Sequence, residues 1–239
     1  MNPHKELQRI EAFSDGVFAI ACTLLVLEIT VPHLDDVTRP AALWSALKRT
    51  WPSLVAYLIS FESILIAWAG HHRALNLLAK SSKAFLYANG LLLLSITFLP
   101  FPTAVLAEYI NTPQANIAVT FYSAASLVAN LSFDLWWLSM FRPTRLLAPS
   151  VSHRAIRKAT TQMMCGTGLY VATTILAYWF PITALVVMFA NQALGLSYRS
   201  AQTSSNPTRR QNLNASPRLA RQKPSLSPVK TSTLTSWRL

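Results

Sequence analysis

The chain is poor in the residues on which many enzyme sites and disulfide frameworks depend. It has six glycines and two cysteines among 239 residues. The sequence contains no Gly-rich phosphate loop, Walker motif or nucleophile with its base, so we expect that the protein is not an enzyme. Cys22 and Cys165 each lie inside an apolar run. A thiol in that setting is typical of packing and not of a disulfide.

Charged residues are also scarce, and their scarcity excludes an ordinary soluble domain. They make up 13% of the sequence, against 52% hydrophobic residues, and the mean hydropathy is +0.32. This is the composition of a membrane protein. The formal net charge of +12 sits in basic clusters between apolar runs, as the positive-inside rule predicts. The clustering therefore argues against nucleic acid as a partner.

The apolar residues form six long segments, which predict the fold class. Each is close to the roughly 20 residues that cross about 30 Å of hydrocarbon. The last two are separated by the sequence WFP at Pro181, because proline ends or kinks a helix. We expect an all-α polytopic membrane protein with six transmembrane helices, at about 12–31, 53–74, 84–107, 115–140, 155–178 and 180–197.

The distribution of Lys and Arg predicts the orientation. The N-terminus carries Lys5 and Arg9, and basic residues also occupy the loops after the second and fourth segments. The loop EYINTPQ after the third segment has none. Cytoplasmic loops carry the excess of positive charge, and an even number of spans brings both termini to the same side. We therefore expect both termini in the cytoplasm and the protein in the inner (plasma) membrane.

The last part of the chain differs in composition from the rest. Residues 201–239 are mostly Ser, Thr, Pro, Asn, Gln, Lys and Arg with no acidic residue, so we expect a disordered basic tail after a transmembrane domain at 1–200. The tail would either contact anionic lipid of the inner leaflet or remain a solvated segment that reinforces the orientation.

Tryptophans indicate where the chain meets the membrane surface. The segment TRPAALWSALKRTW in the first loop predicts an amphipathic helix at the outer interface, anchored by Trp44 and Trp51. Belts of Trp mark both interfaces of membrane proteins. On that basis we also assign three other tryptophans to the interface: Trp136, Trp137 and Trp179.

The first segment, FSDGVFAIACTLLVLEI, combines a carboxylate with an apolar stripe. Asp15 lies within it, and an ionisable group at the centre of a membrane helix costs about 2.5–3.5 kcal/mol on insertion scales. At about 100° per residue, Asp15 points roughly opposite to one stripe. By itself the stripe is typical of ordinary helix packing. Its members are Ile20, Thr23, Leu24, Leu27 and Val31.

The predicted topology supplies partners for Asp15. The first segment starts, the second ends and the third starts at the cytoplasmic side, so several polar groups share one depth. A hydrogen-bonded clamp among them would satisfy groups that lipid cannot; a proton relay through Asp15 and His71 is the other interpretation. The adjacent histidines diverge by about 100°, which argues against a structural metal site of Asp15, His71 and His72. The expected network comprises Arg9, Phe13, Ser14, Asp15, Trp68, His71, His72 and Asn89.

Two further carboxylates in the apolar segments, those of Glu28 and Asp134, each need a binding partner or a functional role. Glu28 lies near the outer end of the first segment, where it would attract cations at a mouth or reach the interface. Asp134 lies toward the inner end of the fourth segment beside a basic loop, so an ion pair with Arg142 or Arg145 is expected.

Three stretches resemble one known family. The run RIEAFSDGVFAIACTLLVLEITVP, with R-x-x-x-F-S-D at Arg9, Phe13, Ser14 and Asp15, resembles the signature first helix of the endo-lysosomal potassium channel family, in its single-repeat prokaryotic branch. The stretches WAGHHR and NGLLLLSITFLPFPT are also similar to that family. The likeness covers about residues 6–200.

The resemblance implies a homotetramer whose first helices surround a cation pathway. The family lacks the carbonyl filter of other potassium channels, and its hydrophobic constriction falls on Ile20, with neighbouring layers on Thr23, Leu24 and Leu27. This is the stripe found from helical angle, so the agreement favours a pore over packing. Potassium would pass transiently near Thr23, without any other cofactor, and the polar clamp becomes the family's structural network. A hydrophobic neck predicts modest selectivity for potassium over sodium.

Two other functions remain open at this point. A proton- or cation-coupled secondary transporter would use Asp15, His71 and Glu62 as titrating groups, and it predicts saturable flux. A structural membrane protein predicts no flux. Transporters often carry Gly- or Pro-broken helices at matching positions of two halves, and no such pair is found in the sequence.

Overall fold

The computed structural model describes residues 3–32, 40–141, 146–148 and 152–204, and within these ranges its regular structure is helical. An isolated bridge between Leu78 and Leu147 is the only β pairing in them. The expected all-α class is therefore confirmed. The chain divides into a compact unit at Met1–Leu196 and a second unit at Ser197–Leu239. Of the second unit only the end of the last helix is described, so the predicted basic tail lies almost wholly outside the described residues.

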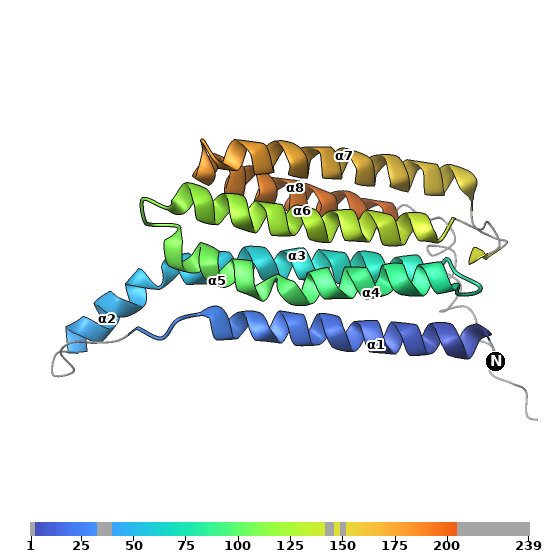
Figure 1. The fold of residues 1–239 in the computed structure, drawn as a ribbon, viewed down its shortest axis with the longest axis horizontal. Coiled ribbons are helices and arrows are strands. Elements are labelled where there is room, and N and C mark those ends of the chain that lie inside the picture. Colours follow the sequence, from blue (N-terminus) through green and yellow to red (C-terminus); the bar gives the residue numbers. More distant parts are fainter. Residues whose placement is uncertain (1–2, 33–39, 142–145, 149–151, 205–239) are drawn as a thin grey trace, which may run out of the picture. The chain divides into compact units, whose positions relative to one another are not determined.

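The helices account for nearly all of the first unit (Figure 1). Each of the six predicted apolar segments is largely helical, but the first, expected to run to about residue 31, leaves the α-helix after Leu24, continues as the 3-10 helix η1 to Glu28 and is not helical at 29–31. The amphipathic segment of the first loop is helical too, and stands out from the bundle beyond the start of α3 in Figure 1. The elements are α1 (Pro3–Leu24), η1 (Leu25–Glu28), α2 (Pro40–Arg49), α3 (Trp51–Leu75), α4 (Lys83–Phe98), α5 (Pro100–Tyr109), α6 (Ala115–Ser139), α7 (His153–Ala177) and α8 (Pro181–Ser204).

The third predicted segment is not one continuous helix. α4 ends at Phe98 and α5 begins at Pro100. Pro100 and Pro102 lack the N–H that continues an α-helical ladder, and the proline ring crowds the preceding turn. Leu99 joins the pieces, because its N–H donates to the Ile96 carbonyl at 3.2 Å and its own carbonyl accepts from the Thr103 N–H at 3.2 Å. The break at WFP, in contrast, lies where the sequence predicts it, between α7 and α8.

Four stretches of helix among the described residues are long and apolar enough to cross a membrane. Their length and composition are consistent with a polytopic membrane protein. α7 does not reach this level of hydropathy, and the apolar part of α8 is shorter, Pro181–Gln192. The first, second and fourth predicted spans each correspond to one of the four stretches, and the third corresponds to α4 and α5 together: the four are Lys5–Glu28, Ala42–Leu75, Lys83–Tyr109 and Ala115–Ser139.

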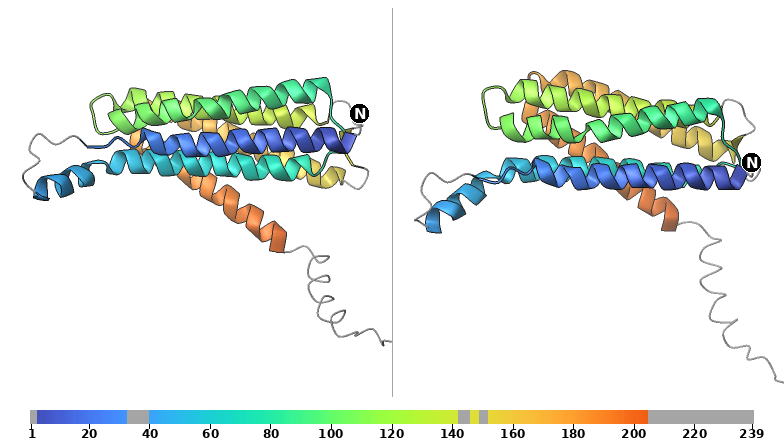
Figure 2. Two further views of the ribbon diagram at one scale, coloured as in Figure 1. Left: turned by 90° about the horizontal axis from the view of Figure 1, so that it is seen from below. Right: turned by 60° about the horizontal axis from the view of Figure 1, so that its bottom comes forward.

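α1 packs on only one side. Figures 1 and 2 show α1 beside α3 and α4, with α6 and α7 further from it. Its contact face buries Phe18, Ala21 and Leu25 almost completely. They recur at helical spacing, so one face of α1 seals against the bundle while the other has no partner within the described part of the subunit.

Candidate functional site

The unpacked side of α1 carries the predicted stripe. We call it the exposed α1 face: Ile20, Thr23, Leu24, Leu27 and Val31. All five are exposed; Ile20 is 58%, Leu27 73% and Val31 76% accessible. Thr23 donates its hydroxyl proton to the Ile20 carbonyl at 2.8 Å, so the lone pairs of Thr23 Oγ1 remain available to a ligand. A continuous apolar face of this kind requires lipid or another subunit to cover it.

Asp15 is anchored to α3. The indole Nε1–H of Trp68 donates to Asp15 Oδ1 at 2.9 Å. The carboxylate is half-buried, and the indole supplies a donor that a bilayer does not offer. The sequence-predicted pair of Asp15 and Trp68 is therefore brought together, and it ties α1 to α3, the next long helix.

A buried chain of three side chains joins three helices next to Asp15. Asn89 of α4 donates through Nδ2 to Ser14 Oγ of α1 at 3.1 Å. Its Oδ1 lies 2.8 Å from His71 Nε2 of α3. A carbonyl oxygen only accepts, so Nε2 carries the proton and His71 is the donor. We call Ser14, Asp15, Trp68, His71 and Asn89 the α1 anchor.

Trp136 of α6 packs against the α1 anchor, a position that the sequence did not predict. It is fully buried, and its ring stacks on His71 with centroids 4.4 Å apart and an interplanar angle of 20°. Trp137 is also buried and donates to Thr160 Oγ1 at 2.9 Å. The assignment of both to an interface belt was wrong, because tertiary packing and not membrane depth determines their position. Trp179, in contrast, is exposed.

Three members of the predicted network lie outside the anchor. Phe13 is 67% exposed and Arg9 is exposed, so both face away from the buried chain. His72 pairs with a neighbour that the sequence did not single out: its Nδ1 lies 3.0 Å from Glu11 Oε1. The spacing of Glu11 and Asp15, four residues on one helix, was the available signal.

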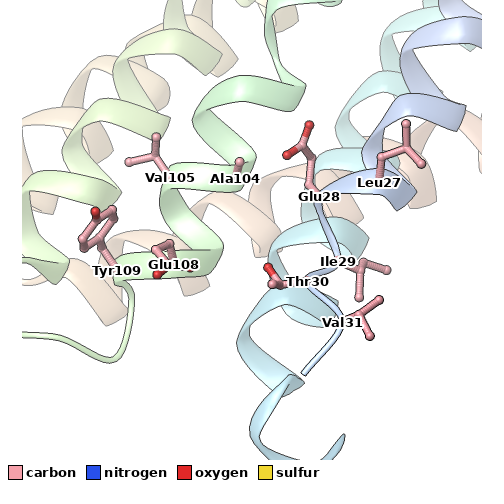
Figure 3. Close-up of a pocket in the computed structure, with 9 residues that line it drawn as sticks. All are labelled: Leu27, Glu28, Ile29, Thr30, Val31, Ala104, Val105, Glu108 and Tyr109. Atoms are coloured by element: carbon pink, nitrogen blue, oxygen red, sulfur yellow. The ribbon is translucent and has the colours of Figure 1, made fainter. Parts of the chain in front are cut away.

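An acidic pocket lies just beyond the C-terminal end of α1. Glu28 lines it together with Glu108 of α5, and the residues after η1 form the other wall (Figure 3). In Figure 3 the Glu28 side chain lies between the backbone of η1 and Ala104. The predicted outer position of Glu28 thus has a second carboxylate close by, on a helix that follows the break at Pro100.

Asp134 is held by α7. It is buried, and it accepts a hydrogen bond from the Thr167 hydroxyl, which itself accepts one from Asn130 Nδ2 at 2.8 Å. Its predicted partners, Arg142 and Arg145, lie outside the described residues. This polar contact fastens α6 to α7 away from α1.

These features define an all-helical, polytopic membrane protein with an exposed apolar face on its first helix and a polar anchor behind it. The family described as the endosomal/lysosomal potassium channel TMEM175 matches residues 9–100. The chain is 44% identical over 186 residues to a potassium channel of Chamaesiphon minutus, spanning 77% of this chain and 91% of that protein. It is 38% identical over 194 residues to a potassium channel of Streptomyces collinus, spanning 81% and 91%.

A solved structure agrees with these relatives. The crystal structure of a lysosomal potassium-selective channel TMEM175 homolog from Chamaesiphon minutus matches with a TM-score of 0.72 at 40% identity, covering 81% of this chain and 98% of that chain. The chain belongs to the TMEM175 family. This confirms the resemblance seen in the first helix, and membership of an ion-channel family supports the expectation that the chain is not an enzyme.

Proposed function

We propose that the protein is a potassium channel in which four copies of α1 surround the ion pathway. One observation carries the proposal: α1 and η1 pack one side against the bundle, while four aliphatic side chains and a threonine between Ile20 and Val31 stay exposed on the other side. Relatives that span most of the chain are named potassium channels. A second, third and fourth copy of the same stripe would cover the exposed α1 face.

The narrowest part of the pathway is proposed at Ile20, with Leu24 and Leu27 on the outer side. Rings of aliphatic side chains form a neck that excludes water until it widens, which is gating by dewetting. Thr23 lies between these layers, and its hydroxyl oxygen is free to accept because its proton is directed to the Ile20 carbonyl. This oxygen would replace part of the hydration of an ion. Potassium releases water more readily than sodium, so a modest preference for potassium follows.

The α1 anchor is proposed to hold the pore helices from behind. It fixes the inner half of α1 to α3 and α4 through groups buried in the subunit. A coupled carrier would instead need Asp15 and His71 to exchange protons with the transported ion. Their engagement in hydrogen bonds to Trp68 and Asn89 favours a static role.

The topology completes the proposal. Six spans with both termini in the cytoplasm agree with the basic clusters of the sequence, and the protein would function in the plasma membrane. α7 would then cross the membrane as a less apolar helix, shielded on one side by α6. Glu28 and Glu108 would lie at the outer mouth, where carboxylates raise the local concentration of cations.

Planar bilayer recording under a potassium gradient with sodium opposed tests the proposal. Wild-type protein is expected to give discrete currents that prefer potassium, and Ile20→Asn is expected to reduce that preference. Ile175→Asn is the matched control, because Ile175 is equally exposed but lies on α7, away from α1 (Figure 1). An Ile20→Asn channel with the wild-type reversal potential would place the neck elsewhere, and saturable flux without unitary steps would indicate a carrier.

A further inference from the structure

Three metal-ligating side chains converge beside the α1 anchor. One ligand atom each from Glu11, Asp15 and His72 lies within 4.8 Å of the other two. Glu11 and Asp15 are one helical turn apart on α1, and His72 reaches them from α3. The shortest separation is 3.0 Å, from His72 Nδ1 to Glu11 Oε1. The three side chains therefore belong to two helices, and not to the surface of one helix alone.

The divergence of the adjacent histidines explains the arrangement. His71 points into the buried chain with Asn89, so His72, about 100° further round α3, points in a different direction and meets Glu11. The metal site considered in the sequence required both histidines on one ion, which their divergence forbids. In the structure Glu11 takes the place of His71 in the set of possible ligands, so the divergence of the two histidines no longer argues against a metal site.

A tryptophan outside the ligand set positions two of its members. The Trp68 indole donates to Asp15 Oδ1 at 2.9 Å, and the Trp68 ring stacks on His72 with centroids 5.9 Å apart and an interplanar angle of 24°. Outer-shell groups that orient ligating carboxylates and imidazoles are a regular part of metal sites. The His72 and Glu11 side chains are 46% and 30% accessible, so an ion has a path of entry.

We propose that Glu11, Asp15 and His72 form a binding site for a divalent transition-metal ion of the zinc type. One imidazole and two carboxylates suit zinc, whose bonds to nitrogen and oxygen are about 2.0–2.2 Å, so that tetrahedral ligand atoms lie roughly 3.5 Å apart. The observed separations of the ligand atoms, 4.8 Å at most, exceed this spacing by little more than about 1 Å. Water completes the coordination, and the bound ion clips the N-terminal half of α1 to α3.

Cobalt titration of the full-length protein in detergent, with any histidine tag removed, tests the site independently of channel activity. Visible absorption of Co²⁺ is expected to saturate at one ion per subunit and to disappear when Zn²⁺ displaces it. Glu11→Gln and His72→Gln should each weaken Co²⁺ binding at least about tenfold, the lower range seen for loss of supporting groups. Glu6→Gln and His153→Gln should leave it unchanged, because Glu6 is on α1 but bonded to Ser81, and His153 is exposed on α7.

Several outcomes overturn the proposal. The proposal is wrong if Co²⁺ binding does not saturate, and it is also wrong if wild type and Glu11→Gln bind Co²⁺ with equal affinity. An absorption band of thiolate type would assign the ion to Cys22 or Cys165 and would also reject it. Gel filtration shows whether each variant is folded. If His72→Gln does not fold, Glu11→Gln alone tests the site, because glutamine keeps the size of the glutamate side chain.

Discussion

Two polar clusters, one partly and one fully buried, join the helices of the chain, and they are built from different chemistry. The α1 anchor uses an imidazole, an amide, an indole and a carboxylate, whose donor and acceptor roles are largely fixed. The second cluster, here named the hydroxyl cluster, consists of Ser60, Thr103 and Tyr122. Ser60 Oγ lies 2.7 Å from Thr103 Oγ1 and 3.0 Å from Tyr122 OH, and all three residues are buried.

The difference lies in how each cluster tolerates loss of a member. In the α1 anchor the amide of Asn89 is the partner of both the His71 Nε2 donor and the Ser14 Oγ acceptor, so removing Asn89 leaves both of these groups without that partner. In the hydroxyl cluster each oxygen can both donate and accept, and the Thr103 hydroxyl also donates to the Leu99 carbonyl, just before its own helix, at 2.8 Å. Fixed roles give a specific geometry for α1, whereas exchangeable roles give adhesion among α3, α5 and α6.

Replacement of Asn89 by Leu should therefore have the largest effect. The change removes the partners of His71 Nε2 and Ser14 Oγ in a buried site, and each unsatisfied group costs about 1–3 kcal/mol. We expect a clear fall in the thermal midpoint of the detergent-solubilised protein, measured by fluorescence-detected gel filtration. Asn111→Leu, at an exposed loop position, is the control. A wild-type midpoint for Asn89→Leu would remove the distinction between the clusters.

Replacement of Asp15 by Ala should have the next largest effect, and it separates anchoring from ion selection. The Trp68 indole loses a charged acceptor, whose hydrogen bond contributes about 1.5–3 kcal/mol. We expect impaired assembly or gating with an unchanged potassium preference in the channels that remain, measured by bilayer recording and by the mass of the solubilised complex. Asp15→Asn keeps an acceptor oxygen and should be milder. Normal assembly and gating of Asp15→Ala would contradict the anchoring role.

Sequence reasoning found the α1 anchor but not the hydroxyl cluster, for a physical reason. An ionisable residue such as Asp15 within an apolar run is costly, so it demands a partner and draws attention. Ser and Thr satisfy themselves on the preceding turn of their own helix, so Ser60 and Thr103 carry no such demand. The contact across helices then follows from packing, which no local pattern records.

Aromatic residues and helix breaks also include positions that the sequence predicts and positions that it does not. Pro181 was interpreted correctly because a single proline follows the end of one apolar run, whereas Pro100 lies inside a run whose hydropathy continues through it. Trp136 was placed at the membrane surface because tryptophan is common there. Its true neighbour, His71, comes from a helix 65 residues earlier. Periodicity predicts which face of a helix is apolar, but not which other helix covers it.

The smallest effect is expected for Ser60→Ala, which tests whether the hydroxyl cluster is as tolerant as its chemistry suggests. The substitution removes the central oxygen, but Thr103 keeps its bond to the Leu99 carbonyl. Hydrogen bonds between membrane helices contribute about 0.6 kcal/mol on average, so the thermal midpoint should fall only slightly and far less than for Asn89→Leu.

Tyr122→Phe removes the other end of the contact and should lower the thermal midpoint by as much as Ser60→Ala. The double variant should lower it little further than either single variant, because both substitutions remove the same bond. A loss as large as that of Asn89→Leu would mean that Ser60 organises α3, α5 and α6 as strictly as Asn89 organises α1, and the contrast between fixed and exchangeable roles would no longer hold.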